Sequence, residues 1–370
     1  MKKSPPVTTG APGRRCILLC PEYFDGRLNG IGRVSEMVGK IAEDLGFRLE
    51  VWSANETGKV PGGRCFGRNY PRMMLQALAV SAGDVGAVVC MHAGLTPVAR
   101  LLARRAGCPT IVYFYGVDVW GRLRARTRWG IRGTNRIVSI SDFTLKECFK
   151  NNPDLLGVPS EVLPLGLMGG GVPPPEFGVP RNSAGRVLLV TRLTKHCVTK
   201  NVRELILAMR HVVARIPDAT LNIVGDGDDR ADLEQFAATR APEAKVCFLG
   251  RIPDDELAGI YARSDVFAMP SKQEGFGLVF VEAMARGLAC VCGDQDASRE
   301  VVEDNVTGFA VDADSPEAIG NAIARLLEDD RLRCRMGTAG WQRYRQSFTQ
   351  EAVFQRLTGV MEKHFGLAAE

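Results

Sequence analysis

The chain lacks any long uninterrupted hydrophobic run, and this absence limits where it can reside. The best candidate, residues 77–89, is interrupted by Asp84 and falls short of the ~18 consecutive apolar residues that a membrane-spanning helix needs. Residues 1–15 carry Lys2 and Lys3 but then Pro, Thr and Gly, where a secretory signal has ~7 to 15 apolar residues. We therefore expect no membrane span, no export and a cytoplasmic location.

Paired cysteines and clustered metal ligands are also scarce. The 11 cysteines are odd in number, extend from Cys16 to Cys334 and include no Cys-x-x-Cys pair. Cys16, Cys20, Cys90 and Cys247 lie in apolar runs, where a free thiol behaves as a small hydrophobe. We therefore expect reduced, buried cysteines and no metal site.

Acidic residues are scarce only in the first half of the chain. Residues 1–180 contain 23 Lys and Arg against 14 Asp and Glu, whereas residues 181–370 contain 24 against 28. The densest basic part, residues 121–136, has six arginines and no acidic residue. A solvated helix face normally mixes both signs, so an anion-facing surface and an ordinary solvated surface both remain open.

The length of the chain and the alternation of its segments indicate two domains. At 370 residues, 45% of them hydrophobic, the chain is long enough for two cores. Short apolar runs of strand length alternate with stretches of helical periodicity on both sides of residues 172–185, which contain four prolines and two glycines. We interpret this segment as a linker. The fold class is therefore α/β, with doubly wound parallel sheets over residues 1–175 and 176–345.

Glycines and carboxylates follow one strand of the second half. In open parallel sheets, ligands bind beyond the carboxyl ends of the strands. Residues 271–287 begin at such an end, and Glu274, Gly275 and Gly277 precede a helix that contains Glu282. The glycines allow backbone amides at a helix N-terminus to approach an anion. Ionised carboxylates instead accept hydrogen bonds from neutral hydroxyls, such as those of a sugar.

Two cations follow another strand of the same half. Arg192 stands at the strand end and Lys200 shortly before a helix. A guanidinium fork and a mobile ammonium together suit one diphosphate. Lys195 is a rival for the phosphate role, and we favour Lys200 because Asn201 follows it at the helix entrance. A third loop, Gly-Asp-Gly at 225–227, is a weak signal alone because such turns are common at strand ends.

In combination, these residues resemble the retaining nucleotide-sugar glycosyltransferases of the GT-B fold, specifically glycosyltransferase family 4, the glycosyl transferases group 1. The resemblance extends over nearly the whole chain and implies two Rossmann-like domains facing a cleft. It rests on the paired glutamates, on the Arg and Lys pair, and on four further motifs: GDG at 225–227, NGIGR at 29–33, HAGLTP at 92–97 and YGVDVW at 115–120.

The resemblance implies a role for each of these residues. Arg192 and Lys200 would neutralise the diphosphate, Glu274 would bind hydroxyls of the transferred sugar, and Glu282 would hold the ribose. The expected catalytic residues are Arg192, Lys200 and Glu274. The expected substrate-binding residues are Glu282, Gly275, Phe276, Gly277, Leu278, Gly30, His92, Tyr115, Asp118, Gly225 and Asp226.

The resemblance also implies the reaction and the partners. A hexose-type sugar would move, with retention, from a UDP- or GDP-sugar to a glycan or polyprenyl-linked acceptor, with no bound metal or cofactor and no nucleic acid. We expect the enzyme to associate peripherally with the anionic inner face of a membrane through its basic first half. A helix at 346–370 would return to the N-terminal domain.

Tyr115 departs from the family pattern. Many members carry a His before Gly-x-Asp/Glu, whereas this chain has Tyr115, which can still donate a hydrogen bond. Structural roles stay open for His92, for Asp118 as a cap and for Glu282 in an ion pair. A catalytically impaired sugar-nucleotide-binding protein and a GT-B-fold epimerase also stay open. A dehydrogenase would need Gly-x-Gly-x-x-Gly, which NGIGRV lacks.

Overall fold

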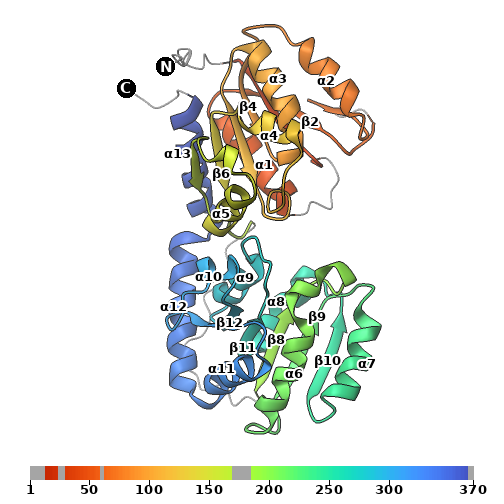
Figure 1. Cartoon of the computed structure of the whole chain (residues 1–370). Helices are drawn as coiled ribbons and strands as arrows, with labels where there is room; N and C mark the ends of the chain where they lie inside the picture. The colour runs from red at the N-terminus through yellow and green to blue at the C-terminus, as the bar shows by residue number, and fades with distance from the viewer. Residues whose placement is uncertain (1–12, 24–29, 59–61, 169–184, 366–370) are drawn as a thin grey trace. The chain divides into compact units, whose positions relative to one another are not determined.

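The computed structural model describes residues 13–23, 30–58, 62–168 and 185–365, and they divide into two compact units. Unit 1 comprises the chain up to Pro164 together with the chain from Glu351 onward, and unit 2 is Leu165–Gln350. Each unit contains one parallel sheet with helices packed on it (Figure 1), which confirms the predicted fold class. The chain leaves unit 1 earlier than the expected residue 175, and the predicted linker lies outside the described residues except for Gly185.

The sheet of unit 1 has the strand order β3-β2-β1-β4-β5-β6-β7. Its strands are buried over much of their length because helices pack on the sheet, and β4 is buried at every position, as its uninterrupted apolar sequence predicts. The strands are β1 (Arg15–Cys20), β2 (Arg48–Ser53), β3 (Gly63–Cys65), β4 (Val85–Cys90), β5 (Thr110–Phe114), β6 (Arg136–Ser139) and β7 (Ser160–Val162).

Local sequence signals begin and end several helices of unit 1. The hydroxyl of Ser141 accepts a hydrogen bond from the amide of Thr144 at 3.1 Å, and Gly107 ends its helix at a φ of 68°. The helices are α1 (Gly30–Asp44), α2 (Tyr70–Leu78), α3 (Thr96–Ala106), α4 (Ala125–Ile131), α5 (Asp142–Asn151) and α13 (Gln350–Phe365), with short 3₁₀ helices η1 (Ala93–Leu95) and η2 (Pro153–Leu155).

The helix α13 packs within unit 1 although it follows unit 2 in the sequence. The ring of Phe365 contacts the ring of Phe47 edge-on, with centroids 5.9 Å apart. The imidazole Nε2 of His364 lies 2.9 Å from a carboxylate oxygen of Glu161, which is part of β7. Unit 1 is therefore assembled from two separate stretches of sequence.

The sheet of unit 2 has the strand order β10-β9-β8-β11-β12-β13. Its strands are β8 (Arg186–Val190), β9 (Thr220–Val224), β10 (Lys245–Gly250), β11 (Val266–Met269), β12 (Ala289–Gly293) and β13 (Gly308–Val311). Its helices are η3 (Lys195–Lys200), α6 (Val202–Val213), α7 (Arg230–Arg240), α8 (Asp254–Arg263), α9 (Leu278–Ala285), α10 (Ser298–Val301), α11 (Pro316–Glu328) and α12 (Asp330–Ser347).

Both sheets reverse their strand order beside their first strand. The reversal lies between β1 and β4 in unit 1 and between β8 and β11 in unit 2. The loops that leave the carboxyl ends of two such strands diverge to opposite faces of the sheet and form a crevice, where open α/β sheets bind ligands. The loops after β8 and β11 are therefore the first place to seek a site.

The cysteine prediction is confirmed for Cys16, Cys20 and Cys90, which are buried, and wrong for Cys247, which is exposed. Cys247 lies in β10 at the edge of its sheet, where alternate side chains face solvent. Burial raises the pKa of the Cys16 and Cys90 thiols to about 12. The described part of the chain contains no cluster of three metal-ligating side chains and no helix long and apolar enough to span a membrane.

Candidate active site

In unit 2 the loops after β8 and β11 are joined by an ion pair. The ammonium of Lys200, at the end of η3, pairs with the carboxylate of Glu274, which lies in the loop after β11. Both side chains are largely sheltered, with 18% and 21% of their surface exposed. The main chains also meet, because the amide of Lys272 donates to the carbonyl of Thr199 at 2.8 Å. The structure thus brings Lys200 and Glu274 together at the point where the strand order reverses.

Asp296 holds the loop that carries Glu274, and the sequence analysis missed it. Its Oδ2 accepts hydrogen bonds from the amide of Glu274 and the hydroxyl of Ser271, both at 2.8 Å, and its Oδ1 accepts from the amide of Ser298 at 2.9 Å. Burial, followed by the charge of nearby Glu274, raises the pKa of Asp296, although hydrogen bonds from Ser298 and Ser271 oppose the rise. The available signal was its position just after the buried strand β12.

The predicted backbone cradle follows Glu274 directly. The amide of Gly275 donates to the Glu274 carboxylate at 3.2 Å, and Phe276 is buried against Phe348 with ring centroids 5.8 Å apart. Gly277 has a φ of 94° and precedes α9, whose first residue is Leu278. A Cβ at Gly277 would lie 2.7 Å from the ring of Phe280, so this turn requires glycine.

Glu282 lies on α9 and is half-buried. Its Oε2 accepts a hydrogen bond from the hydroxyl of Tyr261 at 2.8 Å, and the guanidinium of Arg286 lies over the Tyr261 ring at 4.9 Å. Burial, followed by the charge of Glu282, raises the pKa of Tyr261 well above its ordinary value, so its hydroxyl remains a donor. The structure therefore pairs Glu282 with a neutral hydrogen-bond donor, and its ribose role stays a prediction.

Arg192 and Lys195 have different surroundings in the loop after β8. Arg192 is exposed, and it makes no ion pair with any residue that the structure describes. Lys195 pairs with Asp232 at 3.0 Å and is turned toward α7. Because only Lys200 of the two rival lysines contacts Glu274, the geometry favours the choice made from the sequence.

The Gly-Asp-Gly loop at 225–227 packs against the start of the loop after β8. A Cβ at Gly225 would lie 1.7 Å from the carbonyl oxygen of Thr191, so the close approach requires glycine. The amide of Leu193 donates to the carbonyl of Asp226 at 3.0 Å. The carboxylate of Asp226 accepts from the amide of Gly227 at 2.8 Å and lies 3.9 Å from Arg230. Gly225 therefore shapes the site, whereas Asp226 is occupied by local contacts.

In unit 1 the predicted residues follow β4 and β5, which are neighbouring strands. The Nδ1 of His92 accepts a hydrogen bond from the amide of Gly94 at 3.0 Å and thereby caps η1. One oxygen of Asp118 accepts from the amide of Tyr115 at 3.0 Å. These contacts give both residues structural roles. Their substrate contacts stay predictions. Gly30 begins α1, and Asn29 of the same motif lies outside the described residues.

Tyr115 and Asp118 each bury a polar atom. Tyr115 Oη and Asp118 Oδ2 are inaccessible to solvent and make no hydrogen bond to another described residue. Burial, with Tyr113 and Asp118 nearby, raises the pKa of Tyr115 well above its ordinary value. Burial also raises the pKa of Asp118, and His92 opposes this rise. The tyrosine hydroxyl thus remains a donor, but it is held inside unit 1.

The arginine-rich segment is partly neutralised in the fold. Arg128 and Arg132 both pair with Asp154, at 3.2 and 2.7 Å, and Arg136 lies 3.7 Å from Glu161. The acids come from elsewhere in the sequence, so counting charges within residues 121–136 overestimated the local positive field. Three of the six arginines therefore belong to ion pairs of unit 1.

The chain has two parallel-sheet α/β units, and a lysine and a glutamate pair at the strand reversal of the second. This arrangement is that of a GT-B glycosyltransferase. The family model "Glycosyl transferases group 1" matches residues 180–343, which carry this pair. Together with the relatives described next, this match places the chain in that family: it is a member of the glycosyl transferases group 1.

Curated relatives are named as mannosyltransferases. A GDP-mannose-dependent alpha-(1-6)-phosphatidylinositol monomannoside mannosyltransferase of Mycolicibacterium smegmatis is 32% identical over 287 residues, 74% of this chain and 69% of that protein. A phosphatidyl-myo-inositol mannosyltransferase of Mycobacterium tuberculosis is 40% identical over 146 residues, 38% of each chain. The match to the latter thus spans well under half of its length.

Solved structures share the fold at low sequence identity. A glycosyltransferase from Rickettsia africae superposes with a TM-score of 0.75 over 96% of this chain and 100% of that one, at 17% identity. The sucrose-phosphate synthase of Thermosynechococcus elongatus gives 0.74 over 96% and 100%, at 18% identity. An Anabaena protein solved in complex with UDP gives 0.73 over 94% and 100%, at 17% identity.

Proposed function

We propose that this chain is a retaining hexosyltransferase that moves mannose from GDP-mannose to a lipid-linked acceptor. The observation that carries the proposal is the pairing of Lys200 with Glu274 at the strand reversal of unit 2. The names of the relatives support the donor and the acceptor class, because they specify GDP-mannose and phosphatidylinositol mannosides. The Anabaena structure with UDP supports a nucleoside diphosphate in this fold.

In this proposal Lys200 and Arg192 bind the diphosphate, which carries roughly two negative charges. Lys200 is sheltered and contributes a point charge, whereas Arg192 is exposed and contributes a fork of donors. Glu274 binds hydroxyls of the mannose, and its neighbour Gly275 contributes a backbone amide at the turn before α9. No cofactor is proposed, because these two cations supply the positive charge.

The proposed reaction keeps the configuration at the anomeric carbon. The bond from that carbon to the diphosphate oxygen breaks, a bond to the acceptor oxygen forms on the same face, and the acceptor proton moves to the departing diphosphate. The protein then contributes positioning and charge stabilisation. Lys200 is well placed for charge stabilisation, because it is a sheltered cation in the loop after β8.

A screen of donors followed by a transfer assay tests the proposal. GDP-mannose should raise the melting temperature more than UDP-glucose, UDP-GlcNAc or GDP, and Glu282→Ala should reduce that rise. Transfer of labelled mannose to phosphatidylinositol mannosides in mixed micelles should then give an α-linked product by NMR. Binding without transfer or hydrolysis would favour an impaired sugar-nucleotide-binding protein. Conversion of the donor to an isomer of equal mass would favour an epimerase.

A further inference from the structure

The ion pair between Lys200 and Glu274 joins two groups that are proposed to bind the donor. Glu274 Oε2 accepts from the ammonium of Lys200, and Glu274 Oε1 accepts from the amide of Gly275 at 3.2 Å. The ammonium also donates to the carbonyl of Gln273 at 3.4 Å. Both oxygens of the Glu274 carboxylate therefore have partners inside the protein, so a ligand that binds either side chain competes with a partner already present.

Lys200 is the cation that balances the charge of Glu274. No other ion pair of Glu274 exists among the residues that the structure describes. Lys272, two positions earlier in the same loop, pairs instead with Asp314. Asp296 adds a second carboxylate nearby, because it accepts the amide of Glu274 at 2.8 Å. A ligand that draws Lys200 away therefore leaves Glu274 unbalanced, in a place where only 21% of its side chain is exposed.

We propose that the Lys200–Glu274 pair makes this site select a nucleotide sugar over the nucleoside diphosphate that remains after transfer. A nucleotide sugar replaces both partners at once, because its diphosphate binds Lys200 and a sugar hydroxyl donates to Glu274. A nucleoside diphosphate offers no sugar hydroxyl at this position, so it breaks the ion pair without supplying a new partner for Glu274. The inference deepens the proposed function, on which it rests for the roles of these two side chains.

The charge of the product adds to this selection. The diphosphate of a nucleotide sugar carries roughly two negative charges, whereas a terminal phosphate alone carries about −1.5 to −2 at pH 7. The free nucleoside diphosphate therefore has close to one negative charge more, once the acceptor proton has passed to water. Because Lys200 and Glu274 are in contact, a phosphate bound to Lys200 lies beside the Glu274 carboxylate. Transfer of the sugar thus places like charges next to each other, which favours release of the product.

An orienting role of Glu274 makes the opposite prediction for the product. If the ion pair stayed intact in the complex, Glu274 would hold the ammonium of Lys200 in place for the phosphate. Its removal would then weaken binding of donor and product alike. An exchange of partners predicts weaker binding of the donor but tighter binding of the product. Glu274→Gln separates the two roles, because it keeps the size of the side chain and removes its charge.

Calorimetry of the full-length protein with GDP and GDP-mannose tests the proposal. Glu274→Gln should bind GDP about fivefold more tightly than the parent, because the ion pair no longer opposes binding. It should bind GDP-mannose about tenfold more weakly, because a hydrogen bond to a charged group is lost. In the Lys200→Met background the gain for GDP should fall to about twofold, the part that repulsion alone supplies. Weaker binding of both ligands by Glu274→Gln, or a full fivefold gain in the Lys200→Met background, would overturn the proposal.

A neighbouring ion pair supplies the matched control. Asp314→Asn removes the carboxylate that pairs with Lys272, in the same loop as Glu274, and it should change both affinities by less than about twofold. The transfer assay separates the two proposals. A parent that transfers mannose while Glu274→Gln weakens both ligands contradicts this inference alone, whereas a parent that binds neither ligand contradicts both.

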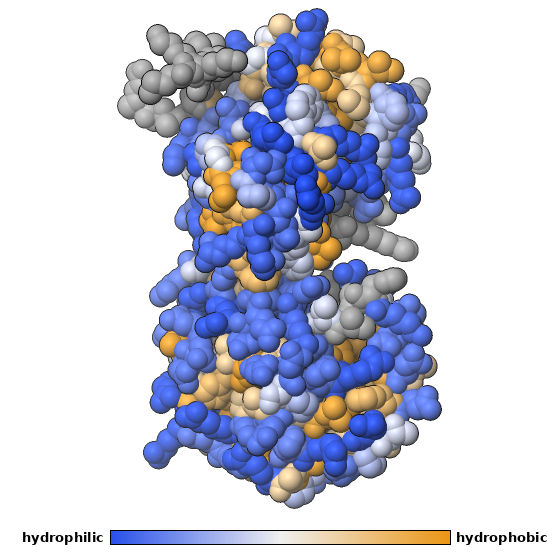
Figure 2. Space-filling model, viewed as in Figure 1, coloured by the Kyte–Doolittle hydropathy of each residue, from blue (hydrophilic) through white to orange (hydrophobic). Residues whose placement is uncertain are grey.

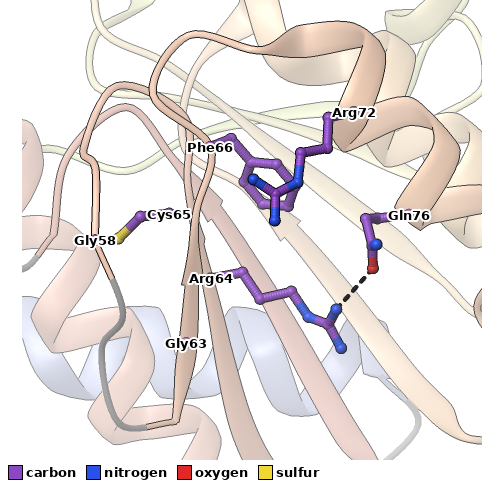
Figure 3. A pocket seen from close by; sticks show the side chains of 7 residues that line it. All are labelled: Gly58, Gly63, Arg64, Cys65, Phe66, Arg72 and Gln76. Atoms are coloured by element: carbon purple, nitrogen blue, oxygen red, sulfur yellow. Dashed lines mark hydrogen bonds between the residues drawn. The ribbon is translucent and has the colours of Figure 1, made fainter.

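Weak binding of the anionic nucleotide elsewhere on the protein is a second point to control. Figure 2 shows hydrophilic residues over most of the visible face of the molecule. In unit 1, Arg64 and Arg72 line a cavity of about 320 Å³ together with Gln76, which accepts a hydrogen bond from Arg64 at 2.7 Å (Figure 3). Arg72→Gln removes a charge from this cavity and should leave both affinities unchanged. A loss of the GDP response in this variant would place the bound GDP in unit 1 and overturn the proposal.

Discussion

Asp296 positions Glu274 through the main chain, since its carboxylate accepts the Glu274 amide at 2.8 Å. The same carboxylate oxygen accepts a hydrogen bond from the hydroxyl of Ser271, so one side chain holds the loop after β11 at two points. Asp296 is 4% exposed. Burying a carboxylate costs free energy of folding unless its oxygens accept hydrogen bonds. Its satisfied bonds therefore hold Glu274 where it can pair with Lys200.

Asp296→Ala should lower kcat/KM by about tenfold to a hundredfold, because a misplacement of ~1 Å at a reacting group can cost that much. The loss should appear as weaker donor affinity by calorimetry as well as slower turnover. Asp294→Ala, an exposed aspartate two positions earlier, is the matched control and should retain activity. Equal activity of the two variants would show that the loop holds its shape without Asp296.

Lys200→Met should lower kcat by about 10²- to 10³-fold, the usual cost of removing one group that stabilises charge in the transition state. Lys195→Met removes a lysine of equal charge that pairs with Asp232 on the surface, and it should change kcat by less than about threefold. Steady-state kinetics of both variants with GDP-mannose decide between the two lysines. The reverse order of effects would transfer the phosphate role to Lys195.

Tyr261→Phe should raise the donor KM by about fivefold with little change in kcat, because the hydrogen bond that holds the Glu282 carboxylate contributes ~1 kcal/mol to binding. The hydroxyl that it removes donates to Glu282, the residue predicted to hold the ribose. Tyr344→Phe alters another buried tyrosine of unit 2 and serves as the control. If both variants have the KM of the unmodified protein, the hydrogen bond to Glu282 has no part in binding.

Gly225→Ala should destabilise unit 2 by about 3 kcal/mol or more, because its Cβ would overlap a backbone oxygen and its φ of 141° disfavours a side chain. Gly359→Ala, in α13 with open space around its Cβ, should change stability by less than about 1 kcal/mol. Urea unfolding measures both differences. A variant Gly225→Ala as stable as the parent would mean that the loop moves without cost.

His364 should make the stability of unit 1 depend on pH. Burial, followed by the charge of Arg136, lowers the pKa of His364 below its ordinary 6.5, despite the contact with Glu161. The folded state then binds the proton less readily than the unfolded state. The contribution of His364 to the free energy of unfolding is therefore present above pH 6.5 and is lost as the pH falls through the folded pKa.

Urea unfolding at pH 7.5 and at pH 5 measures this effect. The difference in unfolding free energy between the parent and His364→Gln should shift against the parent as the pH falls. His211→Gln, which changes an exposed histidine on α6, is the matched control. A parent that gains stability relative to His364→Gln on acidification would contradict the lowered pKa.

The sequence predicted the architecture, and it placed Lys200 and Glu274 in loops that follow strands of one sheet, because both predictions depend on local patterns. Alternating apolar runs specify parallel strands, and the carboxyl ends of neighbouring strands meet at one edge. Asp296 escaped prediction because its role depends on a hydrogen bond to an amide 22 residues away, which no spacing rule encodes. Cys247 was misjudged because an apolar run does not reveal whether its strand lies at a sheet edge.

Tertiary pairing also altered the reading of the charges. Arg128 and Arg132 appear unopposed in the sequence, but the fold supplies Asp154 to both. The surface of α2 was not predicted, because Leu75 and Leu78 have the periodicity of an ordinary buried helix face and only the structure shows which side is covered. Periodicity identifies an amphipathic helix, whereas the packing of its neighbours decides which face meets solvent.

The discontinuity of unit 1 affects how the chain is made. Because α13 follows all of unit 2, a ribosome releases the last helix of unit 1 only after residues 165–350 have emerged. Unit 2 is continuous and can fold as soon as it leaves the exit tunnel. The face of unit 1 that contacts Phe365 stays uncovered until α13 has been synthesised. Premature termination near residue 350 would therefore yield a complete second unit and an unfinished first one.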